Sequence, residues 1–268
     1  MCVKAFWLAA LLFATGGFAT ASGRSIKAVH VSGSGVAYPL LPALLAAYRE
    51  MTPDIAVKLI PIPLGSSGSI RAMAAGRIDV AIIGRELQDT DPANLAGQEL
   101  GRSPIAFVVN GPTGQDSLSQ RDVVEIYRGQ SKNWPNGKPI RIILRPESDS
   151  DSKLIKALSP EISGAIAEAR MRPGMAVATH DLENAEMLGR TPGALGTISL
   201  CQLQAQKLGL QPLTIDGGAR WNSHAQSRPL VVIVQKNAAQ DARDFANFLL
   251  STKAKRILHD LNCPLSSE

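Results

Sequence analysis

Four short polar turns carry the side chains that could do chemistry, and each follows or interrupts a run of apolar residues. The second turn reads Gly-Ser-Ser-Gly-Ser and stands before a helical pattern, and the last two turns contain Arg85 and Arg145. Free N–H groups and hydroxyls at the start of a helix suit an anion, and an arginine fork can hold two of its oxygens. The pattern therefore predicts an anion site. The turns are residues 32–38, 65–69, 84–87 and 145–152.

Enzymatic chemistry is not indicated. The segment 65–69 lacks the last glycine of a G-x-S-x-G nucleophile elbow, and the chain contains neither a P-loop nor a G-x-G-x-x-G motif. The four histidines are far apart, and no Cys-x-x-Cys or His/Cys ligand spacing exists. We therefore expect a protein that is not an enzyme and has no metal site and no cofactor.

Alternating strands and helices must position the four turns. Leu41, Leu44 and Tyr48 have helical spacing after the first turn, and Gly76 is placed to end the helix that follows the second turn. Such alternation predicts an α/β fold, in which ligands collect at the carboxyl ends of the strands. The main expected strands are 25–31, 55–63, 77–83, 139–144, 193–200 and 228–235, and one long helix is expected over 239–261.

The chain begins with a pattern typical of a secretory signal peptide. Lys4 precedes an apolar stretch over residues 5–14, and Ala19-Thr20-Ala21 is a small-x-small cleavage site. We expect cleavage after Ala21 and export of a soluble product to the periplasm. An uncleaved N-terminal membrane anchor is the alternative.

Composition and charge limit the kinds of partner. Apolar residues make up 45% of the chain and charged residues 19%, which is typical of a globular protein. The net charge of +5 is spread without a basic run, and aromatic residues are only 4%. This distribution argues against nucleic acid as a partner, and a diffuse positive charge suits a small anion.

The order of these features resembles that of the periplasmic phosphate-binding proteins of ABC transporters. The resemblance covers nearly all of the chain after the signal peptide. It implies an α/β, two-domain periplasmic-binding-protein-like fold of class II, with mixed sheets, flanking helices and two hinge crossings. The segments that carry it are GSGVAYP (33–39), LGSSGSIRAMAAGRIDVAIIGREL (64–87), VVEIYRGQSKNWPNGKPI (123–140) and PGALGTISL (192–200).

The resemblance also implies a division of the chain. The crossings are expected near residues 110–114 and 221–227. Residues 1–21 would be the signal peptide, residues 22–110 plus 228–268 domain I, and residues 111–227 domain II. Cys201 and Cys263 would then lie in different domains. An exported protein can form a disulfide, but we expect two separate thiols, because buried cysteine is common and a bridge across the hinge would oppose opening.

The family's ligand residues can be placed turn by turn. Ala37 stands where the family has a threonine, which leaves the backbone N–H of Tyr38 and the hydroxyl of Ser34. Ser66 matches the ligand serine of the second turn, and Ser67 lies beside it. The resemblance thus implies a ligand-binding set of eight residues: Ser34, Tyr38, Ser66, Ser67, Arg85, Arg145, Ser150 and Ser152.

Two departures affect the choice of anion. The family's third turn has an aspartate that accepts a proton from bound phosphate, and this chain has Gly84 and Arg85 there. The fourth turn keeps Arg145 but introduces acidic residues among its serines. An acceptor carboxylate separates protonated phosphate from ionised sulfate, so the sequence predicts an oxyanion, with phosphate first.

The expected function is capture of a small oxyanion by a monomeric periplasmic protein that delivers it to the membrane permease of an ABC transporter. The alternative is a periplasmic sensor that presents its bound anion to a membrane signalling partner such as a sensor kinase.

Overall fold

The computed structural model describes residues 28–216, 227–261 and 263. The predicted signal peptide, residues 1–21, lies outside the described residues, and so do residues 221–226 of the predicted second crossing. Within the described ranges, no helix has the length and apolar character needed to cross a bilayer. The same ranges contain no cluster of three or more His, Cys, Asp or Glu side chains suited to a metal ion.

A ten-stranded mixed sheet runs through the molecule in the order β2-β1-β3-β10-β4-β8-β6-β7, with β9 paired to β4 and β5. Strands β1, β2 and β3 are parallel, and the return strand β10 is antiparallel to β3 and β4. The strands are β1 Val29–Gly33, β2 Val57–Leu59, β3 Val80–Ile83, β4 Leu95–Val109, β5 Ser117–Ser119, β6 Arg141–Leu144, β7 Ala176–Val177, β8 Ala194–Ser199, β9 Gln211–Asp216 and β10 Ser227–Gln235.

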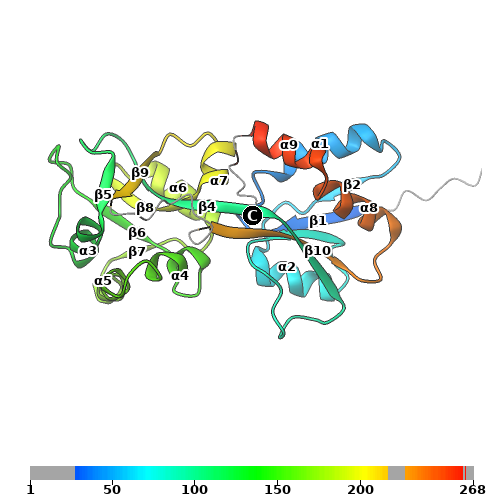
Figure 1. The fold of residues 1–268 in the computed structure, drawn as a ribbon, viewed down its shortest axis with the longest axis horizontal. Helices are drawn as coiled ribbons and strands as arrows, with labels where there is room; N and C mark the ends of the chain where they lie inside the picture. Colours follow the sequence, from blue (N-terminus) through cyan, green and yellow to red (C-terminus); the bar gives the residue numbers. More distant parts are fainter. Residues whose placement is uncertain (1–27, 217–226, 262, 264–268) are drawn as a thin grey trace, which may run out of the picture.

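Helices cover the sheet in two lobes, and β4 and β10 lie in the middle of the molecule (Figure 1). The first lobe carries α1, α2, α8 and α9, and the second carries α3 to α6. The helices are α1 Leu41–Met51, α2 Gly65–Ala74, α3 Gln120–Arg128, α4 Ser150–Lys156, α5 Pro160–Met171, α6 Asp181–Arg190, α7 Leu200–Ala205, α8 Gln240–Leu249 and α9 Thr252–Asp260.

Strand β4 belongs to both lobes. Its residues up to Pro104 pair with β10, and its residues from Ile105 to Val109 pair with β8. Each lobe has apolar clusters of its own, with Phe245 fully buried in the first and Phe107 in the second. The predicted two-lobed α/β fold with mixed sheets is confirmed. The change of strand partner within β4, between Pro104 and Ile105, comes before the expected crossing at residues 110–114. The domain boundaries at residues 110 and 228 remain a proposal.

The expectation for the end of the chain is wrong. Residues 239–261 form two helices, α8 and α9, and not one. The hydroxyl of Ser251 accepts a hydrogen bond from the backbone N–H of Ala254 at 3.2 Å and so caps the second helix. A serine cap stabilises a new helix start at that point, which the continuous apolar periodicity conceals.

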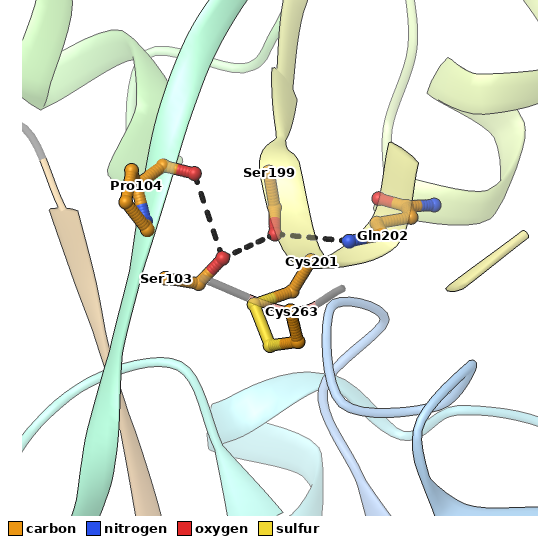
Figure 2. The surroundings of a disulfide bond; sticks show 6 residues. All are labelled: Ser103, Pro104, Ser199, Cys201, Gln202 and Cys263. Carbon is orange, nitrogen blue, oxygen red and sulfur yellow. Dashed lines mark hydrogen bonds between the residues drawn. A yellow bond between two sulfur atoms is a disulfide. The ribbon is translucent and has the colours of Figure 1, made fainter. Parts of the chain in front are cut away.

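The expectation of two separate thiols is also wrong, since Cys201 and Cys263 form a disulfide (Figure 2). Both cysteines are buried in the apolar cluster of the first lobe, because α7 packs against that cluster although it follows β8 of the second lobe. The bridge therefore joins two groups of one core. Beside it, the hydroxyls of Ser103 and Ser199 share a hydrogen bond of 2.6 Å.

Candidate functional site

A cleft of about 800 Å³ lies at the carboxyl ends of β1, β3 and β6, with residues from both lobes in its wall. This is the edge of an α/β sheet at which ligands bind. Six of the eight predicted ligand residues line it: Ser34, Ser66, Ser67, Arg85, Arg145 and Ser150.

Hydroxyl groups of the first lobe form one side of the cleft. Ser34 directly follows β1 and is only 5% exposed, and its Oγ has no hydrogen-bond partner within the described residues. The Ser66 Oγ accepts a hydrogen bond of 3.0 Å from the backbone N–H of Gly84. A Cβ at Gly84 would lie 3.5 Å from the Ser34 Oγ and 3.8 Å from the Ser66 Oγ, so the three residues meet at one point. Both hydroxyls are available to donate to an anion.

The Gly-Ser-Ser-Gly segment is itself the first turn of α2, which begins at Gly65. No side chain caps this end of the helix. The first N–H groups of a helix have no partner inside it and carry a partial positive charge. Since Gly65, Ser66 and Ser67 line the cleft, the helix start adds donors to the hydroxyls.

Arg145 of the second lobe lines the cleft, and Lys153 of α4 is a second cation on that wall. Arg145 directly follows β6 and is only 3% exposed. Its Nη1 donates to the carbonyl oxygen of Ala178 at 3.1 Å, and its Nη2 donates to Asp149 at 2.7 Å and to Asp181 at 3.3 Å. Burial and these partners hold the guanidinium in one orientation.

A second buried arginine, Arg228 of β10, shares the carboxylate of Asp181 with Arg145. Its Nη1 and Nη2 both lie 3.1 Å from Oδ1 of Asp181, and its Nε lies 3.2 Å from Oδ1 of Asp151. Asp181 therefore joins Arg228 of β10 to Arg145 of the second lobe. A Cβ at Gly35 would lie 2.7 Å from Oδ2 of Asp181, so this carboxylate also contacts the first turn.

The pKa values of Asp151 and Asp181 are shifted in opposite directions. Burial raises the pKa of Asp151 to about 6, although the charge of Arg228 acts in the opposite direction. Burial also opposes ionisation of Asp181, but Arg228 and Arg145 outweigh it and hold the pKa of Asp181 below its usual value. With Asp149, the cluster contains two cations and three carboxyl groups. Its net charge is negative when all are ionised and zero when Asp151 is protonated.

Arg85 lines the cleft, but its fork already has a partner. Nη1 and Nη2 donate to the two carboxylate oxygens of Asp91 at 2.7 and 2.9 Å. The hydrogen bonds from Arg85 lower the pKa of Asp91. A further arginine of the wall, Arg102 of β4, lies 3.1 Å from Glu99. The arginines of the cleft are thus matched by carboxylates of the protein.

Two predicted ligand residues do not line the cleft. The backbone N–H of Tyr38 donates to the carbonyl oxygen of Ser34 at 3.2 Å, and the side chain packs on the core of the first lobe. The Ser152 hydroxyl donates to the carbonyl oxygen of Arg145 at 3.2 Å and accepts from Arg170 at 3.1 Å. Tyr38 and Ser152 thus form hydrogen bonds with the backbone of the first and fourth turns and do not line the cleft.

Three residues of the cleft wall are not predicted from the sequence: Asp181, Arg228 and Arg102. Arg228 was visible only as the first residue of an expected strand, and Arg102 lies in a strand that was not predicted. Asp181 follows a histidine in a segment without a motif. Of the three, only Asp181 has a feature that could have been recognised in the sequence, since it is the first residue of a helix, where acidic residues are favoured.

The fold and the cleft together define a class of protein. Two α/β lobes share a central strand, and polar groups from both lobes face one cleft, as in solute-binding proteins. A family model described as a PBP superfamily domain matches residues 19–253. The chain belongs to this family, whose members bind substrates and are not enzymes.

Solved structures share the fold at low sequence identity. A phosphate ABC transporter substrate-binding protein of Clostridium perfringens, solved with bound phosphate, is 20% identical with a TM-score of 0.71, and the match covers 90% of this chain and 100% of that one. An ABC-type phosphate transport receptor of Vibrio cholerae is 19% identical with a TM-score of 0.59, over 87% and 98% of the two chains. The CcmR regulatory domain of Synechocystis PCC6803, in complex with 2-PG, is 13% identical with a TM-score of 0.57, over 83% and 95%.

Proposed function

We propose that the protein captures a small oxyanion, with phosphate first, in the cleft between its lobes. The observation that carries this proposal is the meeting of Ser34, Ser66 and the start of α2 on one wall of a cleft whose other wall holds Arg145. Hydroxyls, free N–H groups and a fixed guanidinium are the donors that a tetrahedral anion requires.

The binding residues follow from this arrangement. Ser34 and Ser66 donate hydroxyl hydrogen bonds, and Ser67 adds a hydroxyl in the first turn of α2. Arg145 and Ser150 close on the anion from the second lobe. Arg85 contributes positive potential more than a direct contact, since Asp91 holds its fork. Tyr38 and Ser152 have no direct contact in this proposal.

The carboxyl groups of the cleft restrict which anions enter. An oxyanion beside Arg145 also comes near Asp149 and Asp181, and like charges at such a site lower its affinity. Phosphate that carries a proton can donate it to a carboxylate, whereas ionised sulfate cannot. In this proposal Asp149 takes the place of the acceptor that the third turn lacks, and this favours protonated phosphate over sulfate.

The physiological role follows from the family. We propose export through a signal peptide cleaved after Ala21, action in the periplasm as a monomer, and delivery of the anion to an ABC transporter permease. Likeness to the CcmR regulatory domain also keeps a sensor role open as a second candidate. A permease gene or a sensor kinase gene beside this one would separate the two roles.

A thermal-shift screen of residues 22–268 tests the proposal. At a ligand concentration of 100 times Kd, binding adds about 2.7 kcal/mol to the free energy of unfolding. For a chain of this size the expected rise in Tm is roughly 5–10 °C. No rise with millimolar phosphate, arsenate, sulfate, phosphite or molybdate would contradict the proposal.

A further inference from the structure

A second cavity lies in the other lobe, away from the cleft. Its volume is about 480 Å³, and its wall includes the first residues of β6 and β7 together with the end of α3. Ile143 of β6 pairs with Ala176 of β7 in parallel register, so this is the amino end of both strands. The cleft lies beyond their carboxyl ends, because Arg145 and Thr179 follow them. We call this second cavity the distal pocket.

The ionisable side chains that line the distal pocket are Lys132, Arg141 and Arg172, and all of them are cations. None of the three forms an ion pair with the described residues. Arg141 donates one hydrogen bond of 2.9 Å to the carbonyl oxygen of Pro192. In the cleft, by contrast, the four arginines of the wall all face carboxylates, and Lys153 is the one lysine of that wall, without an ion pair among the described residues. Positive charge without a partner is thus gathered at the distal pocket.

Arg172 is held in place over the end of α3. A Cβ at Gly129 would overlap its Nη1, so the guanidinium lies directly across this glycine. The backbone at Gly129 is left-handed, with a φ of 74°, which suits a residue without a side chain. The Nε of Arg172 is buried and has no hydrogen-bond partner within the described chain. Since this Nε is itself buried, an anion in the pocket would reach the guanidinium at its Nη groups, which donate no hydrogen bond to the described residues.

Carboxylates near the distal pocket already have partners. Glu125 of α3 accepts from Arg121 at 2.7 Å and from the hydroxyl of Ser131 at 3.3 Å. Glu168 of α5 accepts from Arg128 at 3.2 Å. These contacts pair Glu125 and Glu168 with cations outside the pocket wall, and they leave the three cations of the pocket available.

The remaining wall of the distal pocket is mainly apolar. Its large side chains are Ile126, Ile140, Ile142, Ile143 and Met175. A pocket wall that combines cations with apolar side chains suits a molecule that has an anionic end and an apolar body. An inorganic anion would make no apolar contact with these side chains.

We propose that the distal pocket is a second binding site, which takes a small organic anion. A carboxylate, sulfonate or phosphate ester group contacts Lys132, Arg141 and Arg172, and the organic body lies on the isoleucines and Met175. This site is separate from the cleft and does not depend on the function proposed there.

Fluorescence titration with anilinonaphthalene sulfonate tests the proposal, because this probe has an anionic group and an apolar body. The change is Lys132→Glu in the full mature chain. Lys132 is exposed and forms no ion pair, so the variant keeps its fold. We expect its affinity for the probe to be at least tenfold lower than that of the wild type. The matched control is Lys138→Glu, which makes the same change of charge on the same loop, outside the pocket wall.

The control should bind the probe within twofold of the wild type. Competition then tests the organic part of the proposal: phenyl phosphate should displace the probe at a concentration at least tenfold lower than inorganic phosphate. Equal probe affinities for the wild type and Lys132→Glu would overturn the site, and so would an equal loss in the two variants. Equal displacement by the two competitors would overturn the choice of an organic anion.

Discussion

Removing the charge of Asp181 should strengthen anion binding and weaken the fold. Its Oδ1 accepts hydrogen bonds from Arg228 and Arg145, and its side chain is 11% exposed. The carboxylate thus holds the guanidinium groups that an incoming anion would use. Asp181→Asn keeps one oxygen acceptor, removes the negative charge and replaces the second carboxylate oxygen by an amide NH2 group.

The two effects can be estimated separately. At an effective dielectric constant near 20, unit charges about 6 Å apart interact by about 3 kcal/mol. The amide dipole and solvent reduce this, so we expect a gain of about 1–2 kcal/mol in binding, roughly 5–30-fold in Kd. Breaking a buried ion pair costs about 3–5 kcal/mol. Because asparagine keeps one acceptor, we expect a loss of stability of about 2–3 kcal/mol.

Calorimetric titration with phosphate and thermal unfolding measure the two effects on one preparation. Glu186→Gln is the matched control, since it removes an exposed carboxylate from the same helix, α6, where it pairs with Arg190. The control should change Kd by less than twofold. Unchanged or weaker phosphate binding by Asp181→Asn would refute the conclusion that this carboxylate competes with the anion.

Further predictions concern the guanidinium, the buried acid and the disulfide. Arg145→Lys should lower phosphate affinity more than tenfold, about 1.4 kcal/mol or more by calorimetry, because the fork is lost although the charge remains; a change below threefold would contradict this. Burial raises the pKa of Asp151 to about 6, so anion affinity relative to Asp151→Asn should fall as pH rises through 6. Because the folded-state pKa is raised, Asp151 contributes its full stability below the pKa of the unfolded state, and this contribution is lost as pH rises through 6. Phosphate affinity and the free energy of unfolding, measured against pH, would contradict these two statements if the wild type and Asp151→Asn changed in parallel. Replacing Cys201 and Cys263 by serine should lower the free energy of unfolding by about 4 kcal/mol for a separation of 62 residues, as denaturant titration would measure; a loss under about 1 kcal/mol would contradict it.

Local patterns in the sequence predict much of the fold. The helical spacing of Leu41, Leu44 and Tyr48 places these side chains in the core, where the structure has them. Gly76 ends the helix region with a φ of 65°, as its position predicts. Ser34, Ser66 and Arg145 could be placed at the cleft because each directly follows a strand or starts a helix. Such features depend on neighbours within one element.

Features that depend on distant segments could not be predicted in the same way. The partnership of Asp181 with Arg228 joins residues 47 positions apart, from the start of α6 to the start of β10. The disulfide depends on Cys201 of α7 reaching the core of the first lobe, which the order of elements does not determine. Ser251 begins a new helix within an uninterrupted apolar pattern, and only its cap geometry reveals the break.

Calorimetric titration of phosphate into the mature wild type and Ser66→Ala tests the central claim most directly. Ser66 lies where the first turn of α2 meets Gly84, and its hydroxyl is one of the donors proposed for the anion. We predict one bound phosphate per wild-type chain. The affinity of Ser66→Ala for phosphate should be at least fivefold lower, which is about 1 kcal/mol of binding free energy. No binding to the wild type, or equal affinity in the two proteins, would contradict this prediction.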